Sequence, residues 1–255
     1  MSDSEDGDAV AADMFNEPDD FYEKPKPATS QTHQFLDGRE LPLRLVGQSP
    51  LWGHYLWNAG KTVSAYMEKN ADSLVRGKTV LELGAAAGLP SLTAALNGAT
   101  TVVVTDYQDS DLIENLSINV RACKELQPDA DIHAYGLTWG ADTSRVMSHV
   151  SGRDPPGFDL LILADLLFNH FAHEDLARTV TETMRRSKDA RALVFFTPYR
   201  PWLLEKDLAF FEVAKERGLH VTKIMETVMD KVMFENDRGD ELLRRTVFCY
   251  EMTWC

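Results

Sequence analysis

Long hydrophobic runs, paired cysteines and a surplus of basic residues are all missing from this sequence. No apolar stretch approaches the roughly 20 residues of a membrane-spanning helix, which argues against a membrane protein. The three cysteines, Cys123, Cys249 and Cys255, form no close pair, so we expect free thiols in a reducing, cytoplasmic compartment. The N-terminus also lacks the basic and apolar segments of a secretory signal.

Basic residues are scarce relative to acidic ones. The chain has 26 Lys and Arg against 40 Asp and Glu, a formal net charge of −14. This balance argues against a nucleic-acid partner, because such binding depends on cations that neutralise phosphates. Nine of the acids lie in residues 1–23, which contain no Lys or Arg. We expect residues 1–30, which end in the proline-containing EKPKPATS, to be an acidic disordered tail that either solubilises the chain or faces a basic protein segment.

What the sequence does contain, from Gly77 onward, is an alternation of short apolar runs and helically spaced segments. The apolar runs predict strands over residues 78–84, 100–107, 131–137, 158–165, 192–199, 220–229 and 245–254. The spaced segments predict helices over residues 89–98, 109–123, 173–187 and 203–218. Alternating strands and helices form parallel sheets, and the last strand, which no apolar helix precedes, can return antiparallel. We therefore predict an α/β fold, a Rossmann-like seven-stranded sheet with one antiparallel terminal strand.

The region before this pattern has a different composition. Residues 31–76 contain LWGHYLW, in which Trp52, Tyr55 and Trp57 lie next to glycine. This composition predicts a packed loop that leads into a helix over about 58–70. We expect residues 31–76 to pack on the ligand site of a domain that spans residues 77–255.

The first predicted strand ends in a turn of small residues, VLELGAAAGLP. In open α/β sheets, ligands bind outside the carboxyl ends of the strands where the strand order reverses. Gly84 allows a sharp turn there, and Ala85 and Ala86 let a ligand approach the backbone closely. The alternative is that these residues only allow tight packing.

Two acids near this turn indicate which ligand it binds. Asp106 ends the second strand 22 residues after Gly84, where a carboxylate can accept hydrogen bonds from ribose hydroxyls, although it could instead cap the next helix. Glu82 immediately before the turn would repel a pyrophosphate but attract the ammonium and sulfonium of S-adenosyl-L-methionine. The turn also departs from the G-x-G-x-x-G pattern of NAD sites, so these features favour S-adenosyl-L-methionine as the cofactor.

The segments LELGAAAGLPSL, VVVTDY, LTWG and LLILADLLFNH together resemble the class I methyltransferases. Over residues 48–254 the chain is similar to the family-16 lysine methyltransferase group, once described as nicotinamide N-methyltransferase-like. GQSPLWGHYLWNAG and ADLLFNH resemble the branch that methylates the N-terminal amine and adjacent lysine of translation elongation factor 1-alpha. The resemblance implies a monomeric protein N-methyltransferase with that factor as its protein partner. It places around the cofactor Trp57, Gly84, Ala85, Ala86, Asp106, Trp139 and Ala164.

Residues after the fourth and fifth strands are candidates for the acceptor side. Asp165 ends a very apolar strand, where a charge needs a partner such as a bound amine, a helix N-terminus or a cation. We expect Asp165 to orient the acceptor amine by hydrogen bonding, while Phe168, Tyr199 and Trp57 form dry walls. Two positions depart from the family pattern: the third turn glycine is Ala86, and the Asp-x-x-Tyr element ends in Phe168.

Other functions stay open at this point. A small-molecule N-methyltransferase, for example of nicotinamide, would use the same cofactor site. A non-catalytic binding module is a second alternative, which the altered Phe168 keeps open. An NAD-dependent reductase is disfavoured by the turn and by the lack of a Tyr-x-x-x-Lys pair, and the seven histidines show no metal-ligand spacing with the cysteines.

Overall fold

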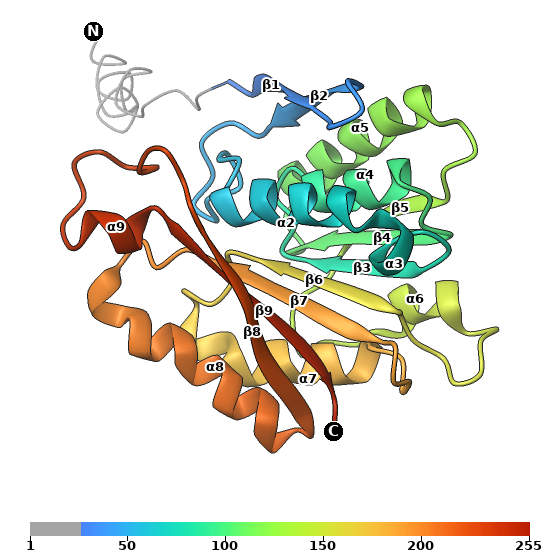
Figure 1. The fold of residues 1–255 in the computed structure, drawn as a ribbon. Helices are drawn as coiled ribbons and strands as arrows, with labels where there is room; N and C mark the ends of the chain where they lie inside the picture. Colours follow the sequence, from blue (N-terminus) through green and yellow to red (C-terminus); the bar gives the residue numbers. More distant parts are fainter. Residues whose placement is uncertain (1–26) are drawn as a thin grey trace, which may run out of the picture.

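A computed structural model describes residues 27–255 (Figure 1). Its first elements are a two-stranded antiparallel hairpin, β1 (Thr29–Gln34) and β2 (Glu40–Leu45), followed by the helices α2 (Asn58–Lys69) and α3 (Ala71–Leu74). The acidic tail predicted for residues 1–30 lies mostly outside the described residues, and its last two residues begin β1.

Within the described chain, seven strands form one sheet in the order β5-β4-β3-β6-β7-β9-β8. The strands are β3 (Thr79–Leu83), β4 (Thr101–Asp106), β5 (Ile132–Gly136), β6 (Leu160–Ala164), β7 (Arg191–Phe196), β8 (Leu219–Val228) and β9 (Thr246–Trp254). β9 pairs antiparallel with both β7 and β8, whereas the other neighbours are parallel. The predicted α/β fold with one reversed strand is therefore confirmed, and the reversed strand lies inside the sheet, between β7 and β8.

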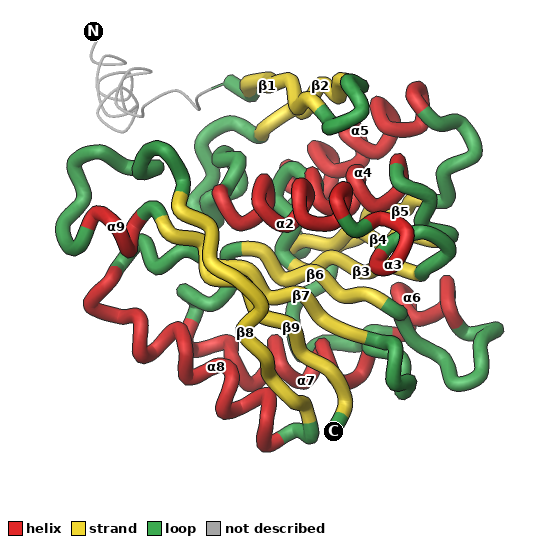
Figure 2. Tube along the Cα trace, in the orientation of Figure 1, coloured by secondary structure: helices red, strands yellow, loops and turns green. Residues whose placement is uncertain are grey.

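Helices cover both faces of this sheet, as Figures 1 and 2 show. One face carries α2, α4 (Leu89–Leu96) and α5 (Ser110–Leu126), and the other carries α6 (Ser144–Met147), α7 (His173–Thr183) and α8 (Leu204–Glu216). Alternate residues of the buried strands belong to separate cores, so that Val80 packs toward the first group of helices and Leu81 toward the second. The remaining short helices are η1 (Ser148–Val150), η2 (His170–Ala172), η3 (Pro201–Leu203) and α9 (Glu241–Arg244).

The hairpin of β1 and β2 was not predicted. In β2 the side chains of Leu41, Leu43 and Leu45 are buried, and the backbone N–H of Arg44 donates to the Asn119 side chain of α5 at 2.9 Å. This period of two is typical of a half-buried strand, but Pro42, which cannot donate a ladder hydrogen bond, obscures the pattern.

No helix in residues 27–255 combines the length and the apolar character that crossing a bilayer requires.

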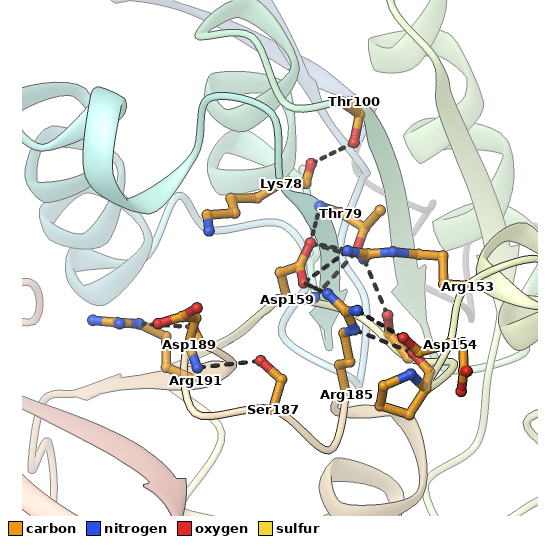
Figure 3. A network of polar contacts seen from close by, with 12 residues as sticks. Lys78, Thr79, Thr100, Arg153, Asp154, Asp159, Arg185, Ser187, Asp189 and Arg191 are labelled. Atoms are coloured by element: carbon orange, nitrogen blue, oxygen red, sulfur yellow. Dashed lines mark hydrogen bonds and ion pairs between the residues drawn. The ribbon is translucent and has the colours of Figure 1, made fainter.

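A polar network joins the amino-terminal ends of β3 and β6 (Figure 3). Asp159 accepts hydrogen bonds from the Thr79 backbone N–H at 3.1 Å and from Arg153 Nη1 and Nη2 at 2.8 and 3.0 Å. Arg185 Nη1 lies 3.4 Å from the same carboxylate. Burial alone would raise the pKa of Asp159, but the donors from Arg153 and Thr79 bring it below its ordinary value. The network closes the end of the sheet opposite to the strand carboxyl ends.

We expect Asp159→Asn to lower the free energy of unfolding by about 2 kcal/mol at pH 7, because two partly buried guanidinium groups lose their countercharge. The folded-state pKa of Asp159 lies below its unfolded value, so the stabilisation is present at neutral pH and is lost as the pH falls through the folded-state pKa. Urea unfolding at pH 7 and pH 3.5 measures both effects. Asp189→Asn, on an exposed turn at the same end of the sheet, is the control and should cost less than about 0.5 kcal/mol. Equal losses in the two variants would contradict this account.

Candidate functional site

The strand order reverses between β3 and β6, so the crevice that binds ligands in such sheets lies outside the carboxyl ends of these two strands. Gly84 follows β3 there, and Asp165 follows β6. Three acids at neighbouring strand ends, Glu82, Asp106 and Asp165, accept hydrogen bonds from backbone N–H groups. The predicted site residues are thus brought to one edge of the sheet.

Glu82 joins β3 to the start of α4. Its carboxylate is 1% exposed and its Oε2 accepts the backbone N–H of Ser91, the third residue of that helix, at 2.8 Å. The N–H groups of the first turn have no partner within a helix, so Glu82 caps α4 from the neighbouring strand. Burial raises the pKa of Glu82 to about 8, although the bond from Ser91 acts in the opposite direction.

The turn after β3 depends on glycine and on Asp106. Gly84 has φ +62°, and a Cβ placed on it would lie 2.5 Å from Leu166 Cδ2 and 3.2 Å from Trp139 Cζ2. Ala86 also has a positive φ, +50°, which costs a residue with a side chain about 1–2 kcal/mol. Its N–H donates to Asp106 Oδ2 at 2.6 Å, which holds this conformation. A glycine, which the family has at the position of Ala86, would adopt this positive φ without that cost.

A narrow cavity of about 20 Å³ follows this turn. Among its lining residues are six of the predicted cofactor residues, namely Trp57, Glu82, Gly84, Ala85, Ala86 and Ala164. Trp139 lies against Gly84 from the side of α6 and α7, and Asp106 supports the turn from β4; neither lines this cavity.

A second cavity, of about 360 Å³, opens beside the first. Its walls combine aromatic side chains with three carboxylates and one guanidinium group: Trp52, Tyr55, Trp57, Phe168, Phe196, Tyr199, Phe234, Asp165, Asp207, Asp237 and Arg200. The rings contact one another, with centroids 5.2 Å apart for Trp57 and Tyr199 and 5.3 Å for Tyr55 and Phe234. Tyr55 and Trp57 line both cavities, so they form the boundary between them.

Asp165 lies in the wall of the larger cavity and is almost fully buried. Its Oδ1 accepts the Thr197 N–H at 2.7 Å, and its Oδ2 accepts the Ala59 N–H at 3.0 Å and the Tyr199 hydroxyl at 3.4 Å. Ala59 is the second residue of α2, so Asp165 caps that helix, which is one of the partners considered for it from the sequence. Burial raises the pKa of Asp165 to about 7 despite these donors.

A tyrosine hydroxyl lies near Asp165 although the Asp-x-x-Tyr element of the family ends in Phe168 here. The hydroxyl that reaches Asp165 comes from Tyr199, after β7, and not from the position of Phe168. The Phe168 ring is 46% exposed and lies in the cavity wall.

Sequence reasoning missed Phe234 and Asp207. Phe234 lies in the β8–β9 connection, where an isolated aromatic within the charged residues 231–244 was a signal. Asp207 is in the first turn of α8, in step with Leu204 and Phe211 on the buried stripe of that helix. A carboxylate on an apolar stripe is unusual unless it has a partner or a function.

No group of three or more His, Cys, Asp or Glu within residues 27–255 is placed to hold a metal ion.

The burial of Glu82 predicts an unusual pH dependence of stability. Its folded-state pKa, about 8, lies above the unfolded value, so the folded protein binds more protons between about pH 4.5 and 8, and the free energy of unfolding falls as the pH rises through this window. Glu82→Gln keeps an acceptor for the Ser91 N–H without the charge. We expect the variant to show a shallower slope and to exceed the wild type by at least about 1 kcal/mol above pH 8.

Denaturant unfolding from pH 5 to 9 tests this expectation. Glu125→Gln, an identical substitution on the exposed face of α5, controls for the loss of one negative charge. Parallel pH curves for the wild type and Glu82→Gln would show that the Glu82 carboxylate is not the cause.

With this geometry in view, comparisons with known proteins identify the family. The family model for lysine methyltransferases matches residues 40–217. The protein N-terminal and lysine N-methyltransferase efm7 of Aspergillus fumigatus is 48% identical over 95% of this chain and 93% of its own length. The protein of the same name in Emericella nidulans is 45% identical over 97% of both chains.

A solved structure shares the fold. It is a protein of Streptococcus mutans presumed to be a SAM-dependent methyltransferase, with a TM-score of 0.59 and 13% identity over 91% of this chain and 56% of that one. This chain therefore spans little more than half of the Streptococcus mutans protein. The match to the family model and the identity to the two fungal relatives show that the chain belongs to the lysine methyltransferase family.

Proposed function

We propose that this methyltransferase transfers a methyl group from S-adenosyl-L-methionine to the N-terminal amine and adjacent lysine of translation elongation factor 1-alpha. The observation that carries the proposal is the larger cavity, in which aromatic rings and three carboxylates lie beside the Gly84 turn. The relatives' names and the resemblance of GQSPLWGHYLWNAG and ADLLFNH to the branch that modifies this factor support the acceptor. We place the enzyme in the cytoplasm as a monomer; the free, buried thiols of Cys123 and Cys249 suit a reducing compartment.

The residues around the turn fit this cofactor. Ala85 and Ala86 line the narrow cavity, and their side chains are no larger than a methyl group. Asp106 accepts two backbone N–H groups, and a carboxylate has about four lone-pair sites, so two stay available for ribose hydroxyls. Ligand cavities usually measure about 300–1,000 Å³, and the narrow cavity, at about 20 Å³, is too small for the cofactor. We therefore propose that Tyr55 and Trp57, at the boundary of the two cavities, move when the cofactor binds.

The chemistry requires this chain to hold a neutral nitrogen in line with the methyl group. The bound cofactor supplies a methyl group activated by its sulfonium, and alignment is the main task that the protein performs. At pH 7, a neutral lysine amine costs about 4 to 5 kcal/mol from its reference pKa, and an N-terminal amine costs about 1 kcal/mol. The aromatic walls lower both costs, because a dry surrounding disfavours the ammonium form.

We assign the acceptor-facing roles as follows. Asp165 supplies negative charge that orients the amine, and its Oδ2 atom is held by the Ala59 N–H at 3.0 Å, with the Tyr199 hydroxyl at 3.4 Å as a weaker partner. Phe168, Tyr199 and Trp57 exclude water from the nitrogen. A bound cationic amine would favour the charged form of Asp165, whose pKa burial has raised to about 7.

Exposed aromatic side chains near the cavity favour a protein acceptor over a small molecule. Phe171, next to the cavity residue Phe168, is fully exposed, and Trp202, close to Arg200 after β7, is more than half exposed. Trp52 and Phe168 in the cavity wall are also exposed. Exposed apolar groups of this size are typical of surfaces that bind another protein, whereas nicotinamide would need only the cavity.

Mass spectrometry of elongation factor 1-alpha from cells that lack this protein tests the acceptor. We expect methylation of the N-terminal amine and of the adjacent lysine to disappear, and to return with the wild-type gene but not with Asp165→Ala. The purified enzyme should also methylate the unmodified recombinant factor. Unchanged methylation in the deletion cells would reject this acceptor, and turnover of nicotinamide without protein would support the small-molecule alternative.

Calorimetric titration with S-adenosylmethionine, S-adenosylhomocysteine and NAD tests the cofactor site. We expect Asp106→Asn to weaken binding of both sulfur cofactors at least about 10-fold, because bonds to a charged acceptor are worth about 1.5–3 kcal/mol. Asp109→Asn is the matched control. Asp109 lies three residues after Asp106 and also accepts two backbone N–H groups, those of Asp111 and Leu112 at the start of α5. Binding of NAD instead, or equal affinities in the Asp106 and Asp109 variants, would overturn the assignment.

A further inference from the structure

Asp207 is a buried carboxylate in the wall of the larger cavity. It lies in the first turn of α8, is 5% exposed, and its Oδ1 pairs with Nε2 of His170 at 2.6 Å. Among residues 27–255, no donor makes a hydrogen bond to the other oxygen, Oδ2. Oδ2 is not one of the buried side-chain atoms left without a partner, so it opens to the cavity, where a ligand can reach it.

Asp207 differs in this respect from Asp165, the other buried carboxylate of the cavity. Both oxygens of Asp165 accept backbone N–H groups, from Thr197 and Ala59, so this side chain is fixed as part of the scaffold. Asp207 has no backbone donor and is held from one side by a histidine. Of the two, Asp207 has more capacity to accept hydrogen bonds from a ligand.

The charged groups around Asp207 are of both signs. His170 and His173 face it from the segment after β6, and Arg200 faces it from the segment after β7. Arg200, however, directs Nη2 to the Phe168 carbonyl oxygen at 3.0 Å and is itself exposed. Asp165 and Asp207 repel each other across the cavity. A cation between them would remove this repulsion.

We infer that Asp207 binds the acceptor amine directly, with Oδ2 accepting an N–H of that amine while His170 holds Oδ1. This inference rests on the proposed function for the identity of the acceptor, and adds Asp207 to Asp165 as a second carboxylate that recognises the amine. Asp207 is a substrate-binding residue, and His170 is a positioning residue that acts through it.

Binding of acceptor peptides in saturating S-adenosylhomocysteine tests the contact without turnover. The probe is the first ten residues of elongation factor 1-alpha with the adjacent lysine replaced by methionine, with either a free or an acetylated N-terminus. Acetylation should weaken binding to the wild type at least 10-fold. In Asp207→Asn this penalty should shrink to less than threefold, because the partner of the amine has been removed.

Several variants separate recognition from structure. Asp207→Glu should restore part of the preference for the free amine, and His170→Gln, which keeps a donor, should preserve more of it than His170→Leu. Glu205→Gln, an exposed carboxylate in the same first turn of α8 that does not line the cavity, is the matched control and should change the affinity less than threefold, since solvent screens its charge. In turnover, Asp207→Asn should raise KM more than it lowers kcat, with cofactor affinity within twofold of the wild type.

A penalty for acetylation that is equal in the wild type and Asp207→Asn would overturn the inference. A wild type that neither binds nor methylates the peptide would instead refute the proposed acceptor. In that case n-butylammonium, followed by tryptophan fluorescence because Trp52 and Trp57 line the cavity, still tests Asp207. Weaker binding in Asp207→Asn than in the wild type would uphold the role of Asp207, and equal binding would reject it.

Discussion

Buried or partly buried carboxylates that accept backbone N–H groups hold this site together. Glu82 ties β3 to α4, Asp165 ties β6 to α2, and Asp106 ties β4 to the turn at Ala86. Each contact joins the carboxyl end of a strand to a segment that would otherwise end in unpaired donors. The small residues of the turn and the aromatic walls can keep their positions because these three contacts fix the backbone around them.

The same carboxylates carry an energetic cost. Burial raises the pKa of Glu82, Asp106 and Asp165, so each of them is less favourable as an anion than in water. A cationic cofactor and a cationic amine are ligands that offset this cost. The contacts that hold the site together are therefore complete without ligands. The cost of burying the three carboxylates is offset when a positively charged ligand binds.

Much of the fold could be predicted from the sequence, because buried parallel strands read as apolar runs and Gly84 and Asp106 lie at a recognisable spacing. Contacts between distant segments could not be predicted in this way. Asp165 meets the N–H of Ala59 from 106 positions away, and nothing in the sequence around either residue indicates the pairing. Phe234 likewise lines the cavity because of the route that the chain takes between β8 and β9, and local sequence patterns do not predict that route.

The insertion of β9 between β7 and β8 has an evolutionary consequence. Residues 229–245 connect two strands that the sheet holds firmly, and this connection supplies Phe234 and Asp237 to the outer wall of the cavity. Changes of length or composition there leave the strand pairing and the Gly84 turn untouched, since loop insertions cost little stability. The outer wall of the larger cavity can therefore change through one connection, whereas the residues that line the narrow cavity at the Gly84 turn all come from other segments of the chain.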